Sequence, residues 1–347
     1  MRIAIEIGGY GARVALRRSR TIEMVEIGPS ESPYLIPAAT FLTDDGRVIA
    51  GPLTNMTVST CGETIFLNEM AADDARYVDM HKALFGYVKT KVESVSTEHI
   101  DAVTVVIPPG VPDSDPRKAK IREAWHQLIP CNVEFISSDV AVCYNRLNFT
   151  EGETALVVDL GFSGLNVSAV CRSSGKIRSA ASYYSTDVSL RMLVSRVFDD
   201  VEQQCKINYK PELALLQVKY IDELCRKMVE SLTHDKNVSV AVPFSTDTYS
   251  ISRNALHQML AKPLGEALKD GIATISAAGA DFTKVGKVVL AGGGALIPCT
   301  AETVEGNIAA AGLTAVHIQK PKLQLEAMME KCRGALQMMP TGGILNF

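Results

Sequence analysis

The sequence has little of several features that mark whole classes of protein. Aromatic residues make up only 6% of the 347 residues, and the basic residues are scattered rather than gathered into stripes. With a net charge of -4, the chain gives no reason to expect nucleic-acid binding. No apolar run reaches the roughly 18 residues of a membrane helix, and no charged segment precedes an apolar core at the start. We therefore expect neither a membrane span nor a secretory signal.

Cysteine and histidine are present, but not in the patterns that bind metal ions. The eight cysteines are spread singly along the chain and form no Cys-x-x-Cys pair. This spacing favours free thiols in a reducing compartment, which we take to be the cytoplasm, over a disulfide framework. The six histidines are isolated, and their positions show no metal-ligand spacing.

Apolar residues are abundant, at 47% of the chain, which is too much for a disordered protein. The length suits two domains or one large two-lobed domain. An apolar strand at 101–107 is followed by a helix at 113–128, with Pro116 in its first turn, and by a strand at 132–137. Strand, helix and strand form a parallel unit, so the predicted fold class is α/β.

The rest of the chain continues this mixture of strands and helices. Paired strands are predicted at 153–170, and a hairpin at 38–51 turns at Asp45-Gly46. Apolar spacing predicts the later helices at 187–206, 212–233, 253–279 and 322–339, and Pro263 predicts a kink in the third of these.

One pattern occurs twice, about 150 residues apart. Residues 3–16 read as an apolar strand, the acid Glu6, an apolar residue, a glycine turn and a second strand. Residues 156–170 repeat that order around the acid Asp159. Two similar halves predict a duplicated fold with a cleft between two lobes.

Glycine-rich hairpin turns expose backbone N–H groups that bind phosphate oxygens. An acid at the end of the strand can hold a hydrated Mg²⁺ beside those phosphates. This chemistry predicts Glu6 and Asp159 as the acids of a phosphate and metal site; the alternative is two ordinary hairpins with charged strand ends. The predicted phosphate-binding residues are Gly8, Gly9, Tyr10, Gly161, Phe162, Ser163 and Gly164.

A third glycine turn follows a buried strand near residue 290. Gly292, Gly293, Gly294 and Ala295 lead from this strand into a helix, and glycines let a flat ligand approach the backbone closely. We expect an adenosine there, with a plain strand-to-helix turn as the alternative. The turn is not a P-loop, because no Gly-Lys-Ser/Thr follows it.

These three pieces, in this order, resemble the ATPase core shared by actin, sugar kinases and the seventy-kilodalton heat-shock chaperones. Further stretches favour the heat-shock branch. Residues 36–56 resemble the segment leading to its Gly-Asp-Ala-Ala-Lys motif, residues 135–144 its Ile-Asn-Glu-Pro-Thr-Ala-Ala-Ala motif, and residues 288–298 its Val-Leu-Val-Gly-Gly-Ser-Thr-Arg-Ile-Pro motif. The resemblance extends over nearly the whole chain, roughly residues 1 to 340.

The resemblance implies a two-lobed actin-like ATPase fold with ribonuclease-H-like lobes and a central nucleotide cleft for ATP or ADP with Mg²⁺. It places lobe I at 1–151 plus 321–347 and lobe II at 152–320, with no substrate-binding domain in this chain. Residues 81–86, "HKALFG", resemble Ala-Lys-Arg-Leu-Ile-Gly, which places Lys82 on the catalytic lysine. The tail with Ile344, Leu345 and Phe347 is either a remnant of the interdomain linker that docks on the lobe or a partner, or a frayed end.

Several positions depart from the family pattern around the phosphates. Glu6 stands where the family carries aspartate, and Gly9 and Tyr10 replace two hydroxyl residues. Ser138 aligns with the buried glutamate that orients the attacking water, with Asp139 beside it as a substitute base.

Other departures fall in the second half of the chain. Gly164 replaces a threonine, with Ser163 beside it. The two cations that sandwich the adenine align with Val229 and Glu230, and the arginine after the last glycine turn aligns with Leu296.

These departures predict very slow or absent hydrolysis, because phosphoryl transfer depends on positioning and charge neutralisation. Loss of the cationic clamp should weaken adenine binding by about 1–2 kcal/mol. The first hypothesis is therefore a non-enzymatic scaffold or assembly subunit that binds protein partners, within a larger assembly. The second is an active ATP-binding chaperone component with nucleotide-dependent lobe closure. The third is a small-molecule kinase, for which the sequence offers no convincing base.

Overall fold

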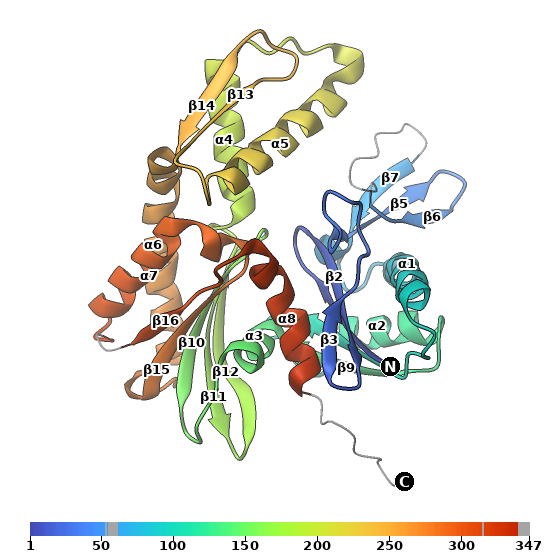
Figure 1. Cartoon of the computed structure of the whole chain (residues 1–347), viewed down its shortest axis with the longest axis vertical. Coiled ribbons are helices and arrows are strands. Elements are labelled where there is room, and N and C mark those ends of the chain that lie inside the picture. The colour runs from blue at the N-terminus through green and yellow to red at the C-terminus, as the bar shows by residue number, and fades with distance from the viewer. Residues whose placement is uncertain (53, 55–61, 314–315, 339–347) are drawn as a thin grey trace. The chain divides into compact units, whose positions relative to one another are not determined.

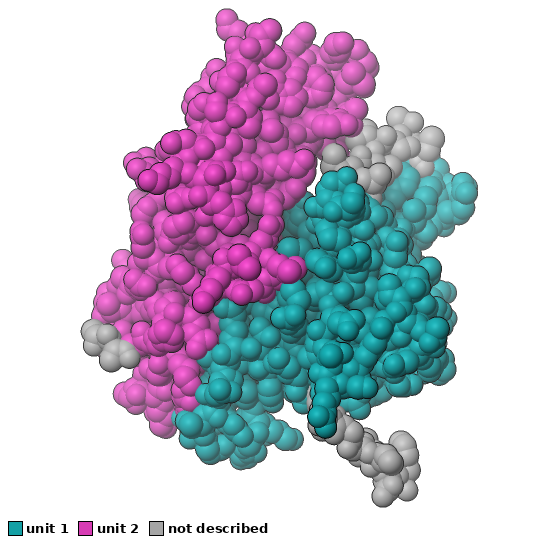
Figure 2. All heavy atoms as spheres, viewed as in Figure 1, with its two compact units in different colours: residues 1–152, 170–180, 328–347 teal, residues 153–169, 181–327 magenta. Residues whose placement is uncertain are grey.

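The computed structural model describes residues 1–52, 54, 62–313 and 316–338. The chain forms two compact units, unit 1 (1–152, 170–180 and 328–347) and unit 2 (153–169 and 181–327), coloured separately in Figure 2. These bounds differ from the predicted lobes in three places: residue 152 and residues 170–180 belong to unit 1, and 321–327 belong to unit 2. The tail residues Ile344, Leu345 and Phe347 lie outside the described residues.

Unit 1 is built on a sheet in the order β3-β2-β1-β8-β9, with β4 also paired to β2. Strand β1 runs antiparallel to β2 and parallel to β8, which is parallel to β9. The predicted strand, helix and strand unit is therefore confirmed. The strands are β1 (Arg2–Ile7), β2 (Gly11–Arg18), β3 (Thr21–Met24), β4 (Ile36–Pro37), β8 (Ala102–Ile107) and β9 (Asn132–Ser137).

The helices of unit 1 pack on this sheet, and a smaller sheet in the order β6-β5-β7 completes the unit (Figure 1). Asp115 caps α2 by accepting a hydrogen bond from the Arg117 N–H. Pro116 lies in the first turn of the helix, as predicted. Trp125 is fully buried and stacks on Phe85 with ring centroids 4.5 Å apart. The remaining elements are α1 (Tyr77–Val95), α2 (Pro116–His126), α3 (Ser138–Arg146), the 3-10 helix η1 (Leu67–Glu69), β5 (Ala39–Thr43), β6 (Val48–Ala50), β7 (Gly62–Phe66) and α8 (Gln324–Met338). The first turn of α8, 324–327, belongs to unit 2.

Unit 2 has a sheet in the order β12-β11-β10-β15-β16 and a separate hairpin, β13-β14; the parts of β11 and β12 within 170–180 belong to unit 1. Its strands are β10 (Thr154–Leu160), β11 (Leu165–Ser173), β12 (Lys176–Ser185), β13 (Asn237–Ala241), β14 (Thr248–Ser252), β15 (Val285–Ala291) and β16 (His317–Gln319). Its helices are α4 (Leu190–Gln204), α5 (Ala214–Ser231), α6 (Arg253–Ala277), α7 (Pro298–Ala310) and the 3-10 helices η2 (Pro211–Leu213), η3 (Phe282–Lys284) and η4 (Gly293–Leu296). Helix α6 continues through Pro263.

The two main sheets share one strand order. In each, the first strand of the unit lies between the second strand of its own hairpin and a parallel strand from later in the chain. This shared order confirms the α/β fold and the internal duplication predicted from the repeated hairpin. Among the described helices, none is both long and apolar enough to cross a membrane.

Candidate functional site

The first glycine hairpin closes through one tight backbone turn. The N–H of Gly8 donates to the carbonyl of Gly11 at 3.0 Å, and the antiparallel register pairs Glu6 with Arg13. A Cβ at Gly11 would lie 2.4 Å from the carbonyl oxygen of Ile36, so the approach of β4 requires glycine there. The turn residues Gly8, Gly9 and Tyr10 are half-buried, and the predicted strand, turn and strand are confirmed.

The acid of this hairpin is buried and paired with two cations of unit 1. The Oε2 of Glu6 lies 3.1 Å from the NH1 nitrogen of Arg13, and its Oε1 lies 3.1 Å from the Nζ of Lys331 on α8. Burial raises the pKa of Glu6, but the charges and hydrogen bonds of Lys331 and Arg13 outweigh burial, and the net pKa is lowered. Glu6 is therefore a carboxylate with a cation on each oxygen.

Helix α8 is held to unit 1 by several contacts around Lys331. The carboxylate of the fully buried Glu330 lies 2.6 Å from the guanidinium of Arg146 on α3. Arg17 donates to the carbonyl of Leu336 at 2.7 Å. A Cβ at Gly334 would lie 1.7 Å from the carbonyl oxygen of Ala141 on α3, so the two helix backbones meet there. These contacts fix the turn of α8 that carries Lys331.

Ser138 and Asp139 reach the same edge of the sheet as Glu6. The parallel register aligns Glu6 with Val106, and Val106 with Ile136. The end of β9 therefore lies level with Glu6, and the axes of β9 and β1 are two strand spacings apart, about 9.6 Å. Both Ser138 and Asp139 are buried in the first turn of α3, where the helix dipole favours a carboxylate. The Oδ1 of Asp139 accepts a hydrogen bond from the Val140 N–H at 2.8 Å, and its Oδ2 has no hydrogen-bond partner among the described residues.

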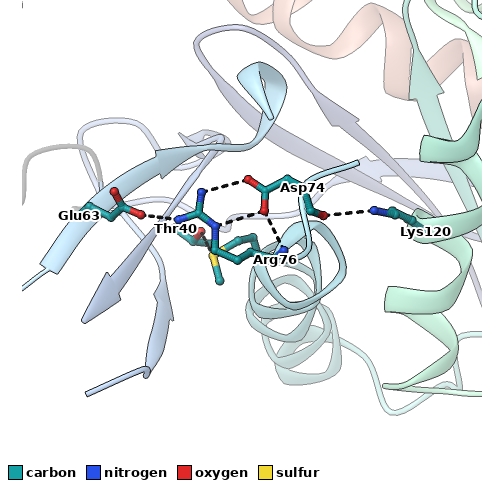
Figure 3. A network of polar contacts seen from close by, with 6 residues as sticks. Thr40, Glu63, Asp74, Arg76 and Lys120 are labelled. Atoms are coloured by element: carbon teal, nitrogen blue, oxygen red, sulfur yellow. Dashed lines mark hydrogen bonds and ion pairs between the residues drawn. The ribbon is translucent and has the colours of Figure 1, made fainter. Parts of the chain in front are cut away.

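Lys82 lies in different surroundings. It is on α1 and lines a cavity of ≈ 380 Å³ together with Arg76, Asp79 and the β5-β6 hairpin. Figure 3 shows the polar network at this end of α1, in which Arg76 pairs with Glu63 and Asp74. None of the residues lining this cavity is one that pairs with Glu6. The structure therefore does not join Lys82 to the Glu6 cluster within the described part of unit 1.

The second hairpin closes through the same turn in unit 2. The N–H of Gly161 donates to the carbonyl of Gly164 at 2.9 Å. Asp159 is buried and aligned with Ala291 of β15, which places the glycine turn beside it. Gly292 has a φ of +77°, and a Cβ there would lie 2.4 Å from the Oδ1 of Asp159. The structure thus brings the second hairpin and the third glycine turn together, and Gly292 is required for that contact.

Two carbonyl groups of the second turn accept hydrogen bonds from the start of α4. The N–H of Leu190 donates to the carbonyl of Gly161, and that of Arg191 to the carbonyl of Phe162, both at 3.0 Å. The Tyr184 hydroxyl donates to the carbonyl of Ser163 at 3.1 Å. The carbonyl groups of Gly161 and Phe162 are therefore turned toward α4, and that of Ser163 toward Tyr184 on β12.

The glycine turn after β15 is covered by apolar side chains. A Cβ at Gly293 would lie 3.1 Å from the Cδ1 of Leu190, and a Cβ at Gly294 would lie 2.4 Å from the Cγ of Leu160. Ala295 is buried. The position predicted to face adenine carries Glu230, whose carboxylate accepts hydrogen bonds from Arg226 at 3.0 Å and from Gln324.

A family model described as Hsp70 protein matches residues 69–317, which is more than half of the chain. The chain belongs to the Hsp70 family. No individual curated protein matches it significantly. The family has the two-lobed actin-like ATPase fold, and its nucleotide-binding domains generally bind ATP or ADP with Mg²⁺. The matched range contains Asp159 and the glycine turn after β15, whereas the first hairpin and α8 lie outside it.

The two acids fit the family's magnesium ion unequally. Within the described residues, no group of three or more His, Cys, Asp and Glu side chains could hold a metal ion by itself; Mg²⁺ is held instead by one or two carboxylates, water and phosphates. Asp159, at a strand end beside two glycine turns, fits this role. Glu6 does not, because Arg13 and Lys331 already neutralise its carboxylate.

Sequence reasoning did not find Arg13 and Lys331. Arg13 could have been found, because a four-residue turn from Gly8 to Gly11 places residue 13 opposite residue 6. Lys331 carried only a weak signal, a Glu-Lys pair inside an otherwise apolar stretch of a helix.

Proposed function

We propose that this chain is a divergent Hsp70 nucleotide-binding domain that hydrolyses ATP very slowly or not at all. In this proposal it acts in the cytoplasm as a scaffold or assembly subunit for protein partners. The observation that carries the proposal is the pairing of Glu6 with Lys331 and Arg13 at 3.1 Å each. An acid neutralised in this way contributes little to organising a metal and its waters around phosphates.

The residues after β9 support slow hydrolysis. Ser138 stands at the position that the resemblance assigns to the water-orienting acid, and a serine hydroxyl does not accept a proton at neutral pH. Asp139, the neighbouring carboxylate, uses Oδ1 for the Val140 N–H. Loss of a group that positions the nucleophile typically lowers the rate by orders of magnitude.

Unit 2 supports retained nucleotide binding. Asp159, the Gly161–Gly164 turn and the Gly292–Ala295 turn lie together, and backbone N–H groups supply much of the binding of phosphates. Because the resemblance aligns Glu230 with a cation that clamps the adenine, we expect affinity weaker by about 1–2 kcal/mol than with a cationic clamp.

One observation favours a second candidate, an active ATP-binding chaperone component with nucleotide-dependent lobe closure. The Oδ2 of Asp139 is buried without a hydrogen-bond partner among the described residues, so a water held there would have a base. Membership of the Hsp70 family leaves the small-molecule kinase without support.

Calorimetric titration of ATP and ADP, with Mg²⁺, into the purified chain tests binding, and single-turnover assays test hydrolysis. We expect micromolar binding that weakens with Asp159→Ala and not with the exposed control Asp44→Ala, together with no turnover above the rate in solution. Turnover that is lost in Asp139→Asn would replace the first candidate with the second. Absence of any binding would leave only the scaffold role.

The Lys82 assignment is tested in the same titration with Lys82→Ala. As a catalytic lysine, Lys82 would affect phosphate binding as strongly as Asp159. Its place in the α1 cavity with Arg76 and Asp79 instead supports a smaller loss of affinity in Lys82→Ala than in Asp159→Ala. Equal losses of affinity in the two variants would support the catalytic-lysine assignment made from the resemblance.

A further inference from the structure

The cavity beside α1 is separate from the residues considered for nucleotide binding in unit 1, apart from Lys82. It lies within unit 1, has a volume of ≈ 380 Å³ and is lined by α1 and the β5-β6 hairpin. None of its lining residues pairs with Glu6 or belongs to the glycine turn at 8–11. Pockets for small molecules measure about 300–1,000 Å³, so the cavity has room for a small organic molecule.

Two side chains of opposite charge line the cavity without partners. Lys82 is half-buried and Asp79 is exposed, and residues three apart on a helix have Cβ atoms about 5–6 Å from each other. Among the residues that the structure describes, neither side chain forms a hydrogen bond or an ion pair, with the other or with any third group. One helix face therefore presents an unpaired ammonium and an unpaired carboxylate to the same space.

Arg76 lines the cavity as well, but its charge is already paired. Its Nε and NH2 nitrogens donate to Asp74 at 3.2 and 3.0 Å, and its NH1 nitrogen pairs with Glu63 (Figure 3). Arg76 therefore closes one side of the cavity and is not counted as a ligand-binding charge. Lys82 and Asp79 are the two lining charges available to a ligand.

The rest of the cavity wall is mainly apolar. Leu42 and Val48 come from the β5-β6 hairpin, and Met80 and Ala83 come from α1. The hydroxyl of Thr40 on β5 donates to the Sδ of the buried Met80 at 3.3 Å, which joins the strand to the helix. An apolar group held between the hairpin and α1 would be removed from water there.

We propose that this cavity binds a small zwitterion with an apolar side chain, of the class of the free apolar α-amino acids. The ligand carboxylate accepts from the Lys82 ammonium, the ligand ammonium donates to the Asp79 carboxylate, and the apolar side chain packs against Leu42 and Val48. A ligand with a single charge would leave either Lys82 or Asp79 unpaired. The site is additional to nucleotide binding and does not depend on it.

The test is calorimetric titration of three related ligands, without nucleotide, into the wild type, Lys82→Met and Asp79→Asn. L-Leucine carries both charges, 4-methylpentanoate lacks the ammonium, and 3-methylbutylamine lacks the carboxylate. L-Leucine should bind the wild type about tenfold more tightly than either analogue, because hydrogen bonds between charged groups are the strong ones. Lys82→Met should weaken L-leucine and 4-methylpentanoate about tenfold and leave the amine unchanged or tighter, and Asp79→Asn should do the reverse.

Two further variants separate binding from general effects. Lys89→Met removes a lysine of the same helix, which is paired at 2.7 Å with Glu93, and it should bind L-leucine as the wild type does. Ala83→Leu fills the cavity without changing its charge and should weaken all three ligands at least about tenfold. The test therefore does not rest on the charge variants alone.

The outcomes distinguish this inference from the proposed nucleotide binding. Failure of L-leucine to bind the wild type overturns the inference, as does an affinity for L-leucine no higher than for an analogue, or an equal loss in Lys82→Met and Lys89→Met. Competition between ADP and L-leucine would make the cavity part of the nucleotide site and overturn the inference while supporting nucleotide binding. L-Leucine binding in the expected pattern without any ADP binding supports the inference and removes the nucleotide.

Discussion

The two glycine hairpins have the same backbone turn and different surroundings. Gly8 to Gly11 and Gly161 to Gly164 are each closed by one N–H to carbonyl bond, at 3.0 and 2.9 Å. Counting from the turns, Arg13 in the first hairpin corresponds to Asn166 in the second. The first acid thus faces a cation across the hairpin, whereas the second faces a neutral amide.

The elements behind the two acids differ as well. In unit 1, helix α8 brings Lys331 to Glu6; in unit 2, strand β15 leads into Gly292, whose backbone lies against Asp159. Duplication of a fold therefore preserves a turn more easily than it preserves the charge around it. The turn depends on a few local glycines, and the charge depends on side chains from distant segments.

The largest expected effect comes from filling the space beside the second acid. Gly292→Ala places a Cβ 2.4 Å from the Oδ1 of Asp159 and 2.5 Å from the Leu160 carbonyl oxygen, at a φ of +77°. We expect a loss of at least ~2 kcal/mol of unfolding free energy, measured by chemical denaturation. The control is Gly306→Ala in α7, where a Cβ meets nothing within 4 Å and where alanine should add about 0.5–1 kcal/mol. Equal effects of the two variants would show that Gly292 is not needed for close approach.

The next effect comes from removing the second cation of the first acid. Lys331→Met leaves the buried Glu6 with Arg13 alone, and we expect a loss of about 1–3 kcal/mol, less than for a fully buried pair because the lysine side chain is 13% exposed. Glu6→Gln/Lys331→Met removes both charges and should recover part of this loss. Urea unfolding curves give both values, and a double variant less stable than the sum of the single ones would contradict a direct pairing.

The pH dependence of stability should reveal the same pair with a smaller effect. The folded-state pKa of Glu6 is lowered below its ordinary value of 4.5, so its contribution is full above that value and is lost as the pH falls through the folded-state pKa. The stability difference between wild type and Glu6→Gln should therefore shrink on acidification below pH 4.5. Denaturation midpoints measured across this range test it; a constant difference would mean that Glu6 titrates normally.

The sequence allowed much of the local structure to be predicted. Both hairpin turns follow from glycines bounded by apolar runs, and the start of α2 follows from Pro116 in its first turn. Strand β12 was not predicted, because "KIRSAASYYS" has one β-branched residue and alternates in exposure without a strong apolar pattern. Local signals thus defined turns and caps, and they missed strands that depend on their neighbours.

The charges of the site were harder to predict than its backbone. Glu6 and Lys331 come from opposite ends of the chain, and no spacing rule links them. Lys82 was assigned by resemblance of six residues, and the structure places it on α1 beside the β5-β6 hairpin. The motif resemblance assigned Lys82 by its sequence position alone, and it carried no information about which cavity the side chain lines.

The smallest effect on stability is expected from copying the charge of the first hairpin into the second. Asn166→Arg introduces a cation at the position that corresponds to Arg13, and because Asn166 is half-buried, we expect a change within about 0.5 kcal/mol. The effect on ligand binding should be larger: the Mg²⁺-dependent gain in ADP affinity should fall about tenfold, while ADP binding in EDTA stays the same or tightens. Arg178→Met removes an exposed arginine in β12, and it controls for the effect of a general change of net charge on ADP affinity. An unchanged Mg²⁺ gain would mean that the residue opposite the acid does not determine whether a hairpin accepts the metal, and the difference between the hairpins would then rest on Lys331 alone.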